Sequence, residues 1–149
     1  MKTIILKSAA VLLLIISVAF TTTETKIVDI TKSSIQWVGH KVTGQHEGTI
    51  TLQEGTLEFN ANQLTGGNFV MDMTTINTTD LQGEYKNKLD GHLKADDFFG
   101  VETHKTAALV FTAVTKNGET YRVVGDLTIK DITNEITFEL AVSENTAST

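Results

Sequence analysis

Apolar and polar residues alternate along most of this chain. Phe69, Met71 and Met73 are each separated by one residue, and so are Phe138 and Leu140. Successive side chains of a strand point to opposite faces, so this period of two places an apolar row on one face of a sheet. The pattern predicts seven strands, near residues 34–42, 48–53, 56–60, 68–75, 107–115, 120–130 and 135–142.

Turn-forming residues separate these strands. Asn117-Gly118 is the strongest hairpin signal in the chain. Glu54-Gly55 and Asp131–Asn134 are expected to break or turn the chain, and Thr65–Asn68 has the composition of a turn. Gly125 lies inside a strand and predicts a bend or a bulge.

Residues 79–106 do not alternate. Between Leu81 and Leu89 an apolar residue recurs every four positions, which is helical spacing. Thr79 or Asp80 is expected to cap this helix, and Gly91 is expected to end it.

The segment Gly91–Phe99 sets charged residues directly against two aromatic residues. Lys94, Asp96 and Asp97 precede Phe98 and Phe99. Such a segment suits a short helix or an ordered loop whose apolar residues plug an opening that the strands leave.

The strands predict an all-β fold, either a sandwich or a barrel. Large residues dominate the apolar row and only one helix is available to cover a sheet, so a barrel is favoured. An eight-stranded barrel is wide enough to hold one small ligand. The same row would also serve as a filled core, and both readings stay open. The large inward residues are Trp37, Phe59, Phe69, Met71, Met73, Phe111, Tyr121 and Phe138.

Residues 1–19 have the layout of a cleaved secretory signal peptide. Lys2 and Lys7 precede the apolar run Ala9–Phe20, and small residues end at Ala19. The competing reading is a retained membrane anchor, but a span needs about 20 apolar residues and this run is shorter. Export to the periplasm or the exterior is therefore expected.

Composition narrows the class of partner. The chain has no cysteine, so neither disulfides nor a lipid-modified cysteine can support or anchor it. After removal of residues 1–19, ten basic residues face eighteen acidic ones, a formal charge of −8. This balance argues against nucleic acid or an anionic membrane surface as the main partner.

The residues nominate no catalytic or metal site. His40 and His46 lie six positions apart, but no cysteine or tight cluster completes a ligand set. Asp96 and Asp97 are adjacent, whereas catalytic carboxylates usually come from different elements. Nucleophile-elbow, Walker and Rossmann patterns are absent from the sequence. We expect no metal, no cofactor and no enzyme activity.

Four segments together resemble the YceI-like domain in sequence, order and spacing. They read WVGHKVTGQHEG at residues 37–48, GGNFVMDM at 66–73, KLDGHLKADDFF at 88–99 and GDLTIK at 125–130. The resemblance extends from about Thr31 to Val142. It implies a lipocalin-like antiparallel β-barrel of eight strands, exported to the bacterial periplasm, that encloses a polyisoprenoid chain.

By this resemblance the inward row lines an apolar tunnel, and its mouth is closed or gated by Leu89, Leu93, Phe98 and Phe99. The ligand would be an isoprenoid lipid, either a quinone or a polyprenyl phosphate. The alternatives are a secreted stress-response or interaction protein with a filled core, and an enzyme acting on a lipid. The expected ligand-binding residues are Trp37, Phe59, Phe69, Met71, Met73, Leu89, Leu93, Phe98, Phe99, Phe111, Tyr121, Leu127 and Phe138.

The chain departs from the family pattern at its end. The family continues for roughly thirty more residues, enough for further strands of ordinary length, whereas residues 143–149 here are a polar tail. We expect residues 20–30 to be a flexible lead-in and 31–142 to form the domain. One or two closing strands are expected to be missing, either because the sequence is partial or because the barrel has an open seam. A homodimer across that seam is a further expectation.

Overall fold

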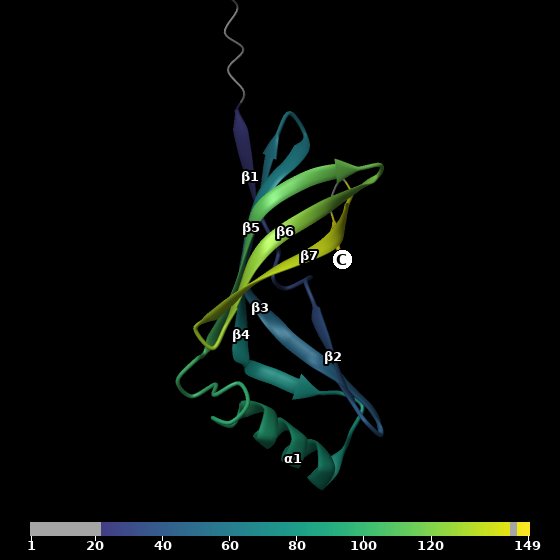
Figure 1. Cartoon of the computed structure of the whole chain (residues 1–149), viewed down its shortest axis with the longest axis vertical. Coiled ribbons are helices and arrows are strands. Elements are labelled where there is room, and N and C mark those ends of the chain that lie inside the picture. Colours follow the sequence, from purple (N-terminus) through teal and green to yellow (C-terminus); the bar gives the residue numbers. More distant parts are fainter. Residues whose placement is uncertain (1–21, 144–145) are drawn as a thin grey trace, which may run out of the picture.

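The alternating segments form one curled antiparallel sheet with a single helix at one end (Figure 1). The computed structural model describes residues 22–143 and 146–149. The sheet order is β1-β3-β4-β5-β6-β7-β8, and β2 also pairs with β3. The elements are β1 (Thr23–Ile27), β2 (Ile35–Lys41), β3 (Gly44–Asn60), β4 (Gln63–Thr78), α1 (Gly83–Lys94), β5 (Thr106–Asn117), β6 (Thr120–Ile129), β7 (Ile132–Val142) and β8 (Ala147–Ser148).

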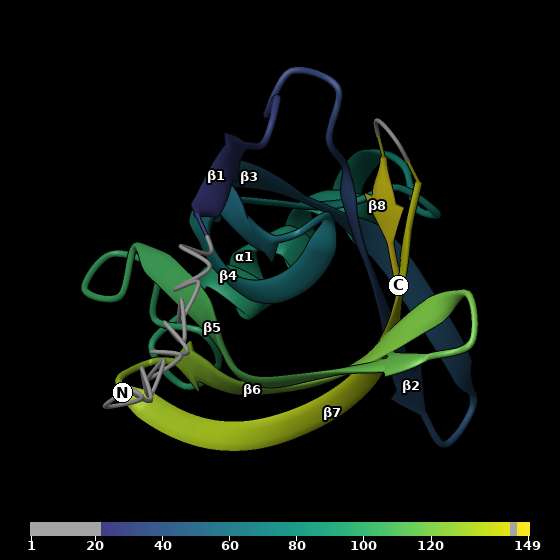
Figure 2. The ribbon, with the colours of Figure 1, turned by 90° about the horizontal axis from the view of Figure 1, so that it is seen from above.

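The sheet curls into a half-barrel that does not close (Figure 2). In the described part of the chain, β7 pairs with β6 and, at Ala141 and Val142, with β8, and neither β7 nor β8 pairs with β1 or β2. The prediction of an all-β, lipocalin-like barrel with an incomplete end is confirmed in this half-barrel form. The predicted signal peptide lies outside the described residues. Among the described helices, none is long and apolar enough to cross a membrane.

Two segments expected to lack structure contain short strands. Residues 23–27 lie in the expected flexible lead-in, yet they form β1 and pair with residues 56–60 of β3. Residues 147–148 lie in the expected polar tail and form β8 beside β7. Alternation did not reveal either strand because all their residues are exposed.

Three glycines at two expected breaks lie inside strands, so those predictions were wrong. Gly55 belongs to β3, and Gly66 and Gly67 belong to β4. A Cβ atom at Gly55 would lie 2.9 Å from the Phe69 ring, and one at Gly67 would lie 2.7 Å from the Phe111 ring. These glycines make room for aromatic rings of neighbouring strands.

The true β3–β4 turn is at residues 61–62. Ala61 and Asn62 adopt φ values of 48° and 63°, the left-handed region that tight hairpins require. The expected Asn117-Gly118 hairpin is present between β5 and β6. The next turn is at Lys130 and Asp131, earlier than the expected 131–134, and β7 starts at Ile132.

A bend in β4 separates the upper part of the sheet from the part that meets α1. Thr49 pairs with Asn77 and Thr51 with Asp72, so four residues of β4 lie opposite one residue of β3. The Thr75 hydroxyl accepts a hydrogen bond from the Thr51 amide at 2.9 Å and donates to the Asp72 carbonyl at 2.7 Å. Asn77 and Thr78, which follow this bend, form hydrogen bonds with side chains of α1.

The helix differs from its prediction at both ends. It begins after Gln82, without a side-chain cap, because the Asp80 carboxylate binds His46 and the Thr79 hydroxyl binds the Glu47 carbonyl. It continues past Gly91 to Lys94. The added turn buries Leu93, which is 7% exposed.

Candidate functional site

The upper concave face carries an aromatic ladder. The Phe69 and Phe111 ring centroids are 5.5 Å apart, and those of Phe111 and Phe138 are 5.7 Å apart. All three rings are half-buried and pack on a buried cluster that includes Phe59 and Tyr121. Five of the predicted ligand-binding residues therefore meet here, on strands β3 to β7.

A second apolar cluster lies at the helix end of the sheet. Met73 is buried there with Val101 and Ala107, and Met71 and Phe99 pack against them, half-buried. Three more predicted residues are therefore brought together, but apart from the aromatic ladder.

The segment after α1 closes this end. The Lys130 ammonium donates to the backbone carbonyls of Asp96 at 2.5 Å and Phe98 at 3.1 Å, which ties the segment to the β6–β7 turn. Phe98 is 43% exposed and packs edge-on against Phe99, with ring centroids 4.7 Å apart. The prediction of a plug therefore fits Phe99, whose ring packs inward, and Phe98 covers it from outside.

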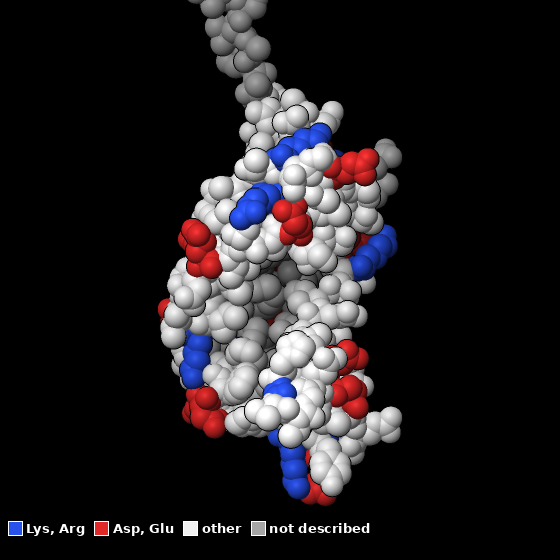
Figure 3. All heavy atoms as spheres, turned by 45° about the vertical axis from the view of Figure 1, so that its right-hand side comes forward, with Lys and Arg blue, Asp and Glu red and all other residues white. Residues whose placement is uncertain are grey.

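The molecule is hollowed between its upper and lower parts (Figure 3). Leu127 pairs with Leu109, which pairs with Phe69, so these three residues form one row across β4, β5 and β6. Leu127 is half-buried and belongs to neither buried cluster. The row is half-buried: Phe69 belongs to the aromatic ladder, and Leu109 lies between Phe111 of the upper cluster and Ala107 of the lower one.

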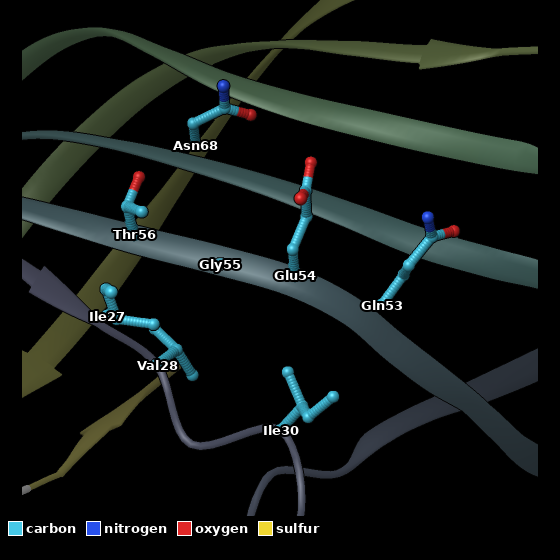
Figure 4. Close-up of a pocket in the computed structure, with 8 residues that line it drawn as sticks. All are labelled: Ile27, Val28, Ile30, Gln53, Glu54, Gly55, Thr56 and Asn68. Carbon is cyan, nitrogen blue, oxygen red and sulfur yellow. The ribbon is translucent and has the colours of Figure 1, made fainter.

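Two surface grooves are lined by other residues. One, of about 450 Å³, runs beside β1 and β3, where Ile27, Val28 and Ile30 lie near Glu54 and Asn68 (Figure 4). The other, of about 660 Å³, is lined by residues of both charges, Lys94, Lys105, Asp72 and Glu102 among them. None of the predicted ligand-binding residues lines either groove.

A polar anchor fixes α1 to the end of β4. The Asp90 carboxylate accepts hydrogen bonds from the Thr78 amide at 2.8 Å and from the Lys86 ammonium at 2.7 Å. Lys86 also donates to the Thr78 carbonyl at 2.8 Å and to Asn77 Oδ1. Burial raises the pKa of Asp90, but the hydrogen bonds from Lys86 and Thr78 outweigh it, so the pKa lies below its usual value of 3.8.

His46 contacts two charged side chains. His46 Nδ1 lies 2.8 Å from Asp80 Oδ2, and His46 Nε2 lies 2.9 Å from the Lys41 ammonium. The hydrogen bond from His46 lowers the pKa of Asp80. In residues 22–143 and 146–149, no three His, Asp or Glu residues are grouped to hold a metal ion.

Four predicted residues line the helix end without joining the second cluster. Leu93 is buried, and Leu89 and Trp37 are half-buried. Phe98 is the most exposed of the four.

Three deeply buried residues are not marked by the alternation of apolar and polar positions. Leu64 and Ile76 are 3% and 2% exposed, and Val101 is 5% exposed. The bend in β4 shifts Ile76 out of the alternation of Phe69, Met71 and Met73. Val101 follows the helix in an irregular turn, where no period exists to mark it.

The comparisons with known proteins agree with this fold. The model of the YceI-like domain matches residues 27–149. The chain belongs to the YceI-like domain family. A UPF0312 protein of Serratia proteamaculans is 40% identical over 65 residues, covering 44% of this chain and 33% of the relative. A UPF0312 protein of Staphylococcus epidermidis is 34% identical over 117 residues, covering 76% of this chain and 64% of the relative.

A solved structure has a fold similar to that of this chain. BcnA of Burkholderia cenocepacia superposes with a TM-score of 0.64 at 22% identity, over 80% of this chain and 73% of that chain. At this identity the likeness concerns the fold alone. The chain spans a third to about two thirds of the length of the two UPF0312 relatives.

Proposed function

We propose that this chain binds an isoprenoid lipid non-covalently in the hollow of its half-barrel and carries it in the bacterial periplasm. The observation that carries the proposal is the row of half-buried apolar residues, Phe69, Leu109 and Leu127, between two apolar clusters. Membership of the YceI-like family supports it. The signal-peptide pattern of residues 1–19 supports the compartment.

The energetics favour a hydrocarbon chain as the occupant. Each buried CH₂ group contributes about 0.8 kcal/mol, so one five-carbon isoprene unit contributes several kcal/mol before ordering costs. Methionines such as Met71 adapt their shape to a flexible apolar guest. The head group is proposed to be a quinone or a polyprenyl phosphate.

The second candidate is a secreted stress-response or interaction protein with a filled core. The upper cluster favours it, because Val123 is 0% exposed and Leu140 and Leu64 are nearly so. In that case the row of Phe69, Leu109 and Leu127 would also pack against other side chains of the protein and leave no room for a ligand.

A tryptophan placed in the hollow separates the two candidates. Leu127→Trp adds volume on the concave face, while Val110→Trp is the control on the outer face of the neighbouring strand, where Val110 is 45% exposed. The carrier predicts that Leu127→Trp keeps the stability of the unchanged chain and loses binding of a fluorescent prenyl probe. A filled core predicts destabilisation of about 1–3 kcal/mol from overpacking instead.

We also propose that a second copy of the chain covers the open seam. The outer edge of β7 from Ile132 to Leu140 has unpaired backbone groups within the described residues, and such edges pair readily with another strand. Sedimentation velocity over a wide concentration range is expected to show a dimer. A single species of monomer mass at all concentrations contradicts this part of the proposal.

A further inference from the structure

The unpaired edge of β7 has definite limits. β7 begins at Ile132, directly after the β6–β7 turn, and β8 pairs with its last two residues. Within the described part of the chain, the edge is therefore free from Ile132 to Leu140, and Ile136 lies at its midpoint.

The backbone groups that point out of this edge belong to the odd-numbered residues. Successive residues of a strand direct their N–H and C=O groups to opposite edges. Ile129 and Ile132 flank a two-residue turn, where such residues exchange hydrogen bonds, and β6 and β7 then pair without a register shift. At the other end, the Ser143 amide donates to the Thr146 carbonyl, just before β8, at 2.8 Å. The residues with outward backbone groups are therefore Thr133, Glu135, Thr137 and Glu139.

Two copies of this edge can pair around a two-fold axis. The two β7 strands are then antiparallel, and both copies use the same surface. Residues with outward backbone groups must lie opposite one another to exchange hydrogen bonds, so odd-numbered residues pair with odd-numbered ones. The even-numbered residues of both copies then lie together on the concave face.

The length of the free edge selects one register. With Ile136 opposite Ile136 of the second copy, Ile132 lies opposite Leu140 and the whole free edge is paired. A shift by two residues in one direction sets Leu140 opposite the β6–β7 turn. The opposite shift brings Ile132 against the part of β7 that β8 already occupies.

The acidic residues of β7 select the same register. In it, Glu135 lies opposite Thr137 of the second copy, and Glu139 lies opposite Thr133. The two shifted registers would place Glu135 opposite either Glu135 or Glu139 of the second copy, and like charges directly opposite each other are destabilising. Asp126 of β6 pairs with Glu135 in the same chain, which adds to the negative charge there.

This pairing also covers an exposed apolar residue. Ile132 is 63% exposed, whereas Leu140 is 4% exposed and belongs to the upper cluster. In the selected register, Ile132 of each copy lies beside Leu140 of the other copy on the concave face. Removing this apolar surface from water favours association.

We infer that the partner of the β7 edge is β7 of a second copy, paired antiparallel with Ile136 on the two-fold axis. The inference rests on the dimer proposed above, and it names the strand and the register that form it. The hollows of the two copies then share one continuous concave face.

Cysteine cross-linking tests the register, because the chain has no cysteine of its own. Ile136→Cys sets two thiols opposite each other in a pair without exchanged hydrogen bonds, where Cα atoms lie about 4.5 Å apart. A disulfide spans Cα distances of about 4.4 to 6.8 Å. Asn134→Cys is the matched control on the same face, and its Cα atoms would lie about 13 Å apart along the strands. Under a mild oxidant, we expect Ile136→Cys to form a covalent dimer and Asn134→Cys to form none.

Charge substitutions at the exposed Thr137 test the same register. Thr137→Lys would face Glu135 of the second copy, whereas Thr137→Glu would set like charges opposite each other, and the two-fold axis doubles each effect. We expect the dimer dissociation constant of Thr137→Lys to be lower than that of Thr137→Glu by about tenfold or more in sedimentation velocity. Thr115→Lys and Thr115→Glu make the same charge changes at an exposed position of β5, which β6 separates from the edge. Their dissociation constants should differ by less than about threefold.

The outcomes separate this register from the dimer itself. A monomer at all concentrations overturns both. A dimer in which Ile136→Cys does not cross-link, or in which Asn134→Cys cross-links as fast, overturns the β7 pairing and assigns the edge to another strand, such as β1 of the second copy. If Ile136→Cys does not fold, the charge variants decide, and equal dissociation constants for Thr137→Lys and Thr137→Glu overturn the register. Lipid binding is measured separately, so its loss is not confused with any of these results.

Discussion

Replacing Asp90 by alanine tests whether a polar anchor holds α1 over the helix end of the sheet. The substitution removes two hydrogen bonds, of 2.8 Å from the Thr78 amide and 2.7 Å from Lys86. Thr78 is 1% exposed, so its amide would lose its only hydrogen-bond partner among the described residues, out of reach of water. One lost charge-assisted hydrogen bond and one unpaired buried amide together cost about 2–4 kcal/mol.

Glu84→Ala is the matched control on the same helix. Glu84 pairs with Lys88 at the same spacing of four residues and the same 2.7 Å distance, but both side chains are more than two thirds exposed. Exposed pairs of this kind contribute about 0.3–0.5 kcal/mol. Urea unfolding at pH 7 should therefore give a much larger loss of unfolding free energy for Asp90→Ala than for Glu84→Ala.

The pH dependence adds a second readout. The pKa of Asp90 is lowered in the folded state, so the anchor stabilises the fold above the usual carboxyl pKa of 3.8 and is lost as the pH falls below it. The difference between the unchanged chain and Asp90→Ala should shrink in that acidic window. Equal losses for Asp90→Ala and Glu84→Ala at pH 7 would refute the anchor.

Two further paired substitutions test the packing. Gly48→Ala should destabilise the fold by about 1–3 kcal/mol, because the new Cβ would lie 2.0 Å from the Asn77 carbonyl oxygen. Gly91→Ala should stabilise the fold by about 0.5–1 kcal/mol, because it lies in a helix and its new Cβ would have no atom within 4 Å. Thermal unfolding measures both, and equal effects would contradict the packing at Gly48. Phe99→Ala should cost about 2 kcal/mol, since Phe99 packs against the Met73 cluster, and Phe98→Ala less than half of that. The reverse order in urea unfolding would show that Phe98 is the plug.

Local sequence patterns predicted the strands where one face is buried. Tyr121 and Val123 are 7% and 0% exposed, as their alternation with Arg122 predicts. The Asn117-Gly118 hairpin followed from the residue types that a tight turn requires. In these segments the local pattern and the tertiary packing agree.

The errors arose where a residue serves a distant neighbour. Gly55 and Gly67 were predicted to break the chain. Glycine is needed at these positions because the rings of Phe69 and Phe111, on neighbouring strands, occupy the space that a Cβ atom would take. Ala61 and Asn62 make a left-handed turn without glycine. The bend after Asp72 also lacks glycine and proline, so the sequence carried no signal for it.

The candidate site was predictable in composition but not in arrangement. Alternation correctly placed Phe69, Phe111 and Phe138 on one concave face, where they stack. It could not divide the apolar row into two clusters, because that division depends on the bend in β4 and on how the sheet curls.

Native mass spectrometry of the gently purified full chain, followed by extraction into organic solvent, tests the lipid-carrier function most directly. We predict a reproducible added mass that leaves with the solvent and fragments into five-carbon steps. A protein that carries no added mass, and gains none after incubation with prenyl quinones or polyprenyl phosphates, would contradict the account.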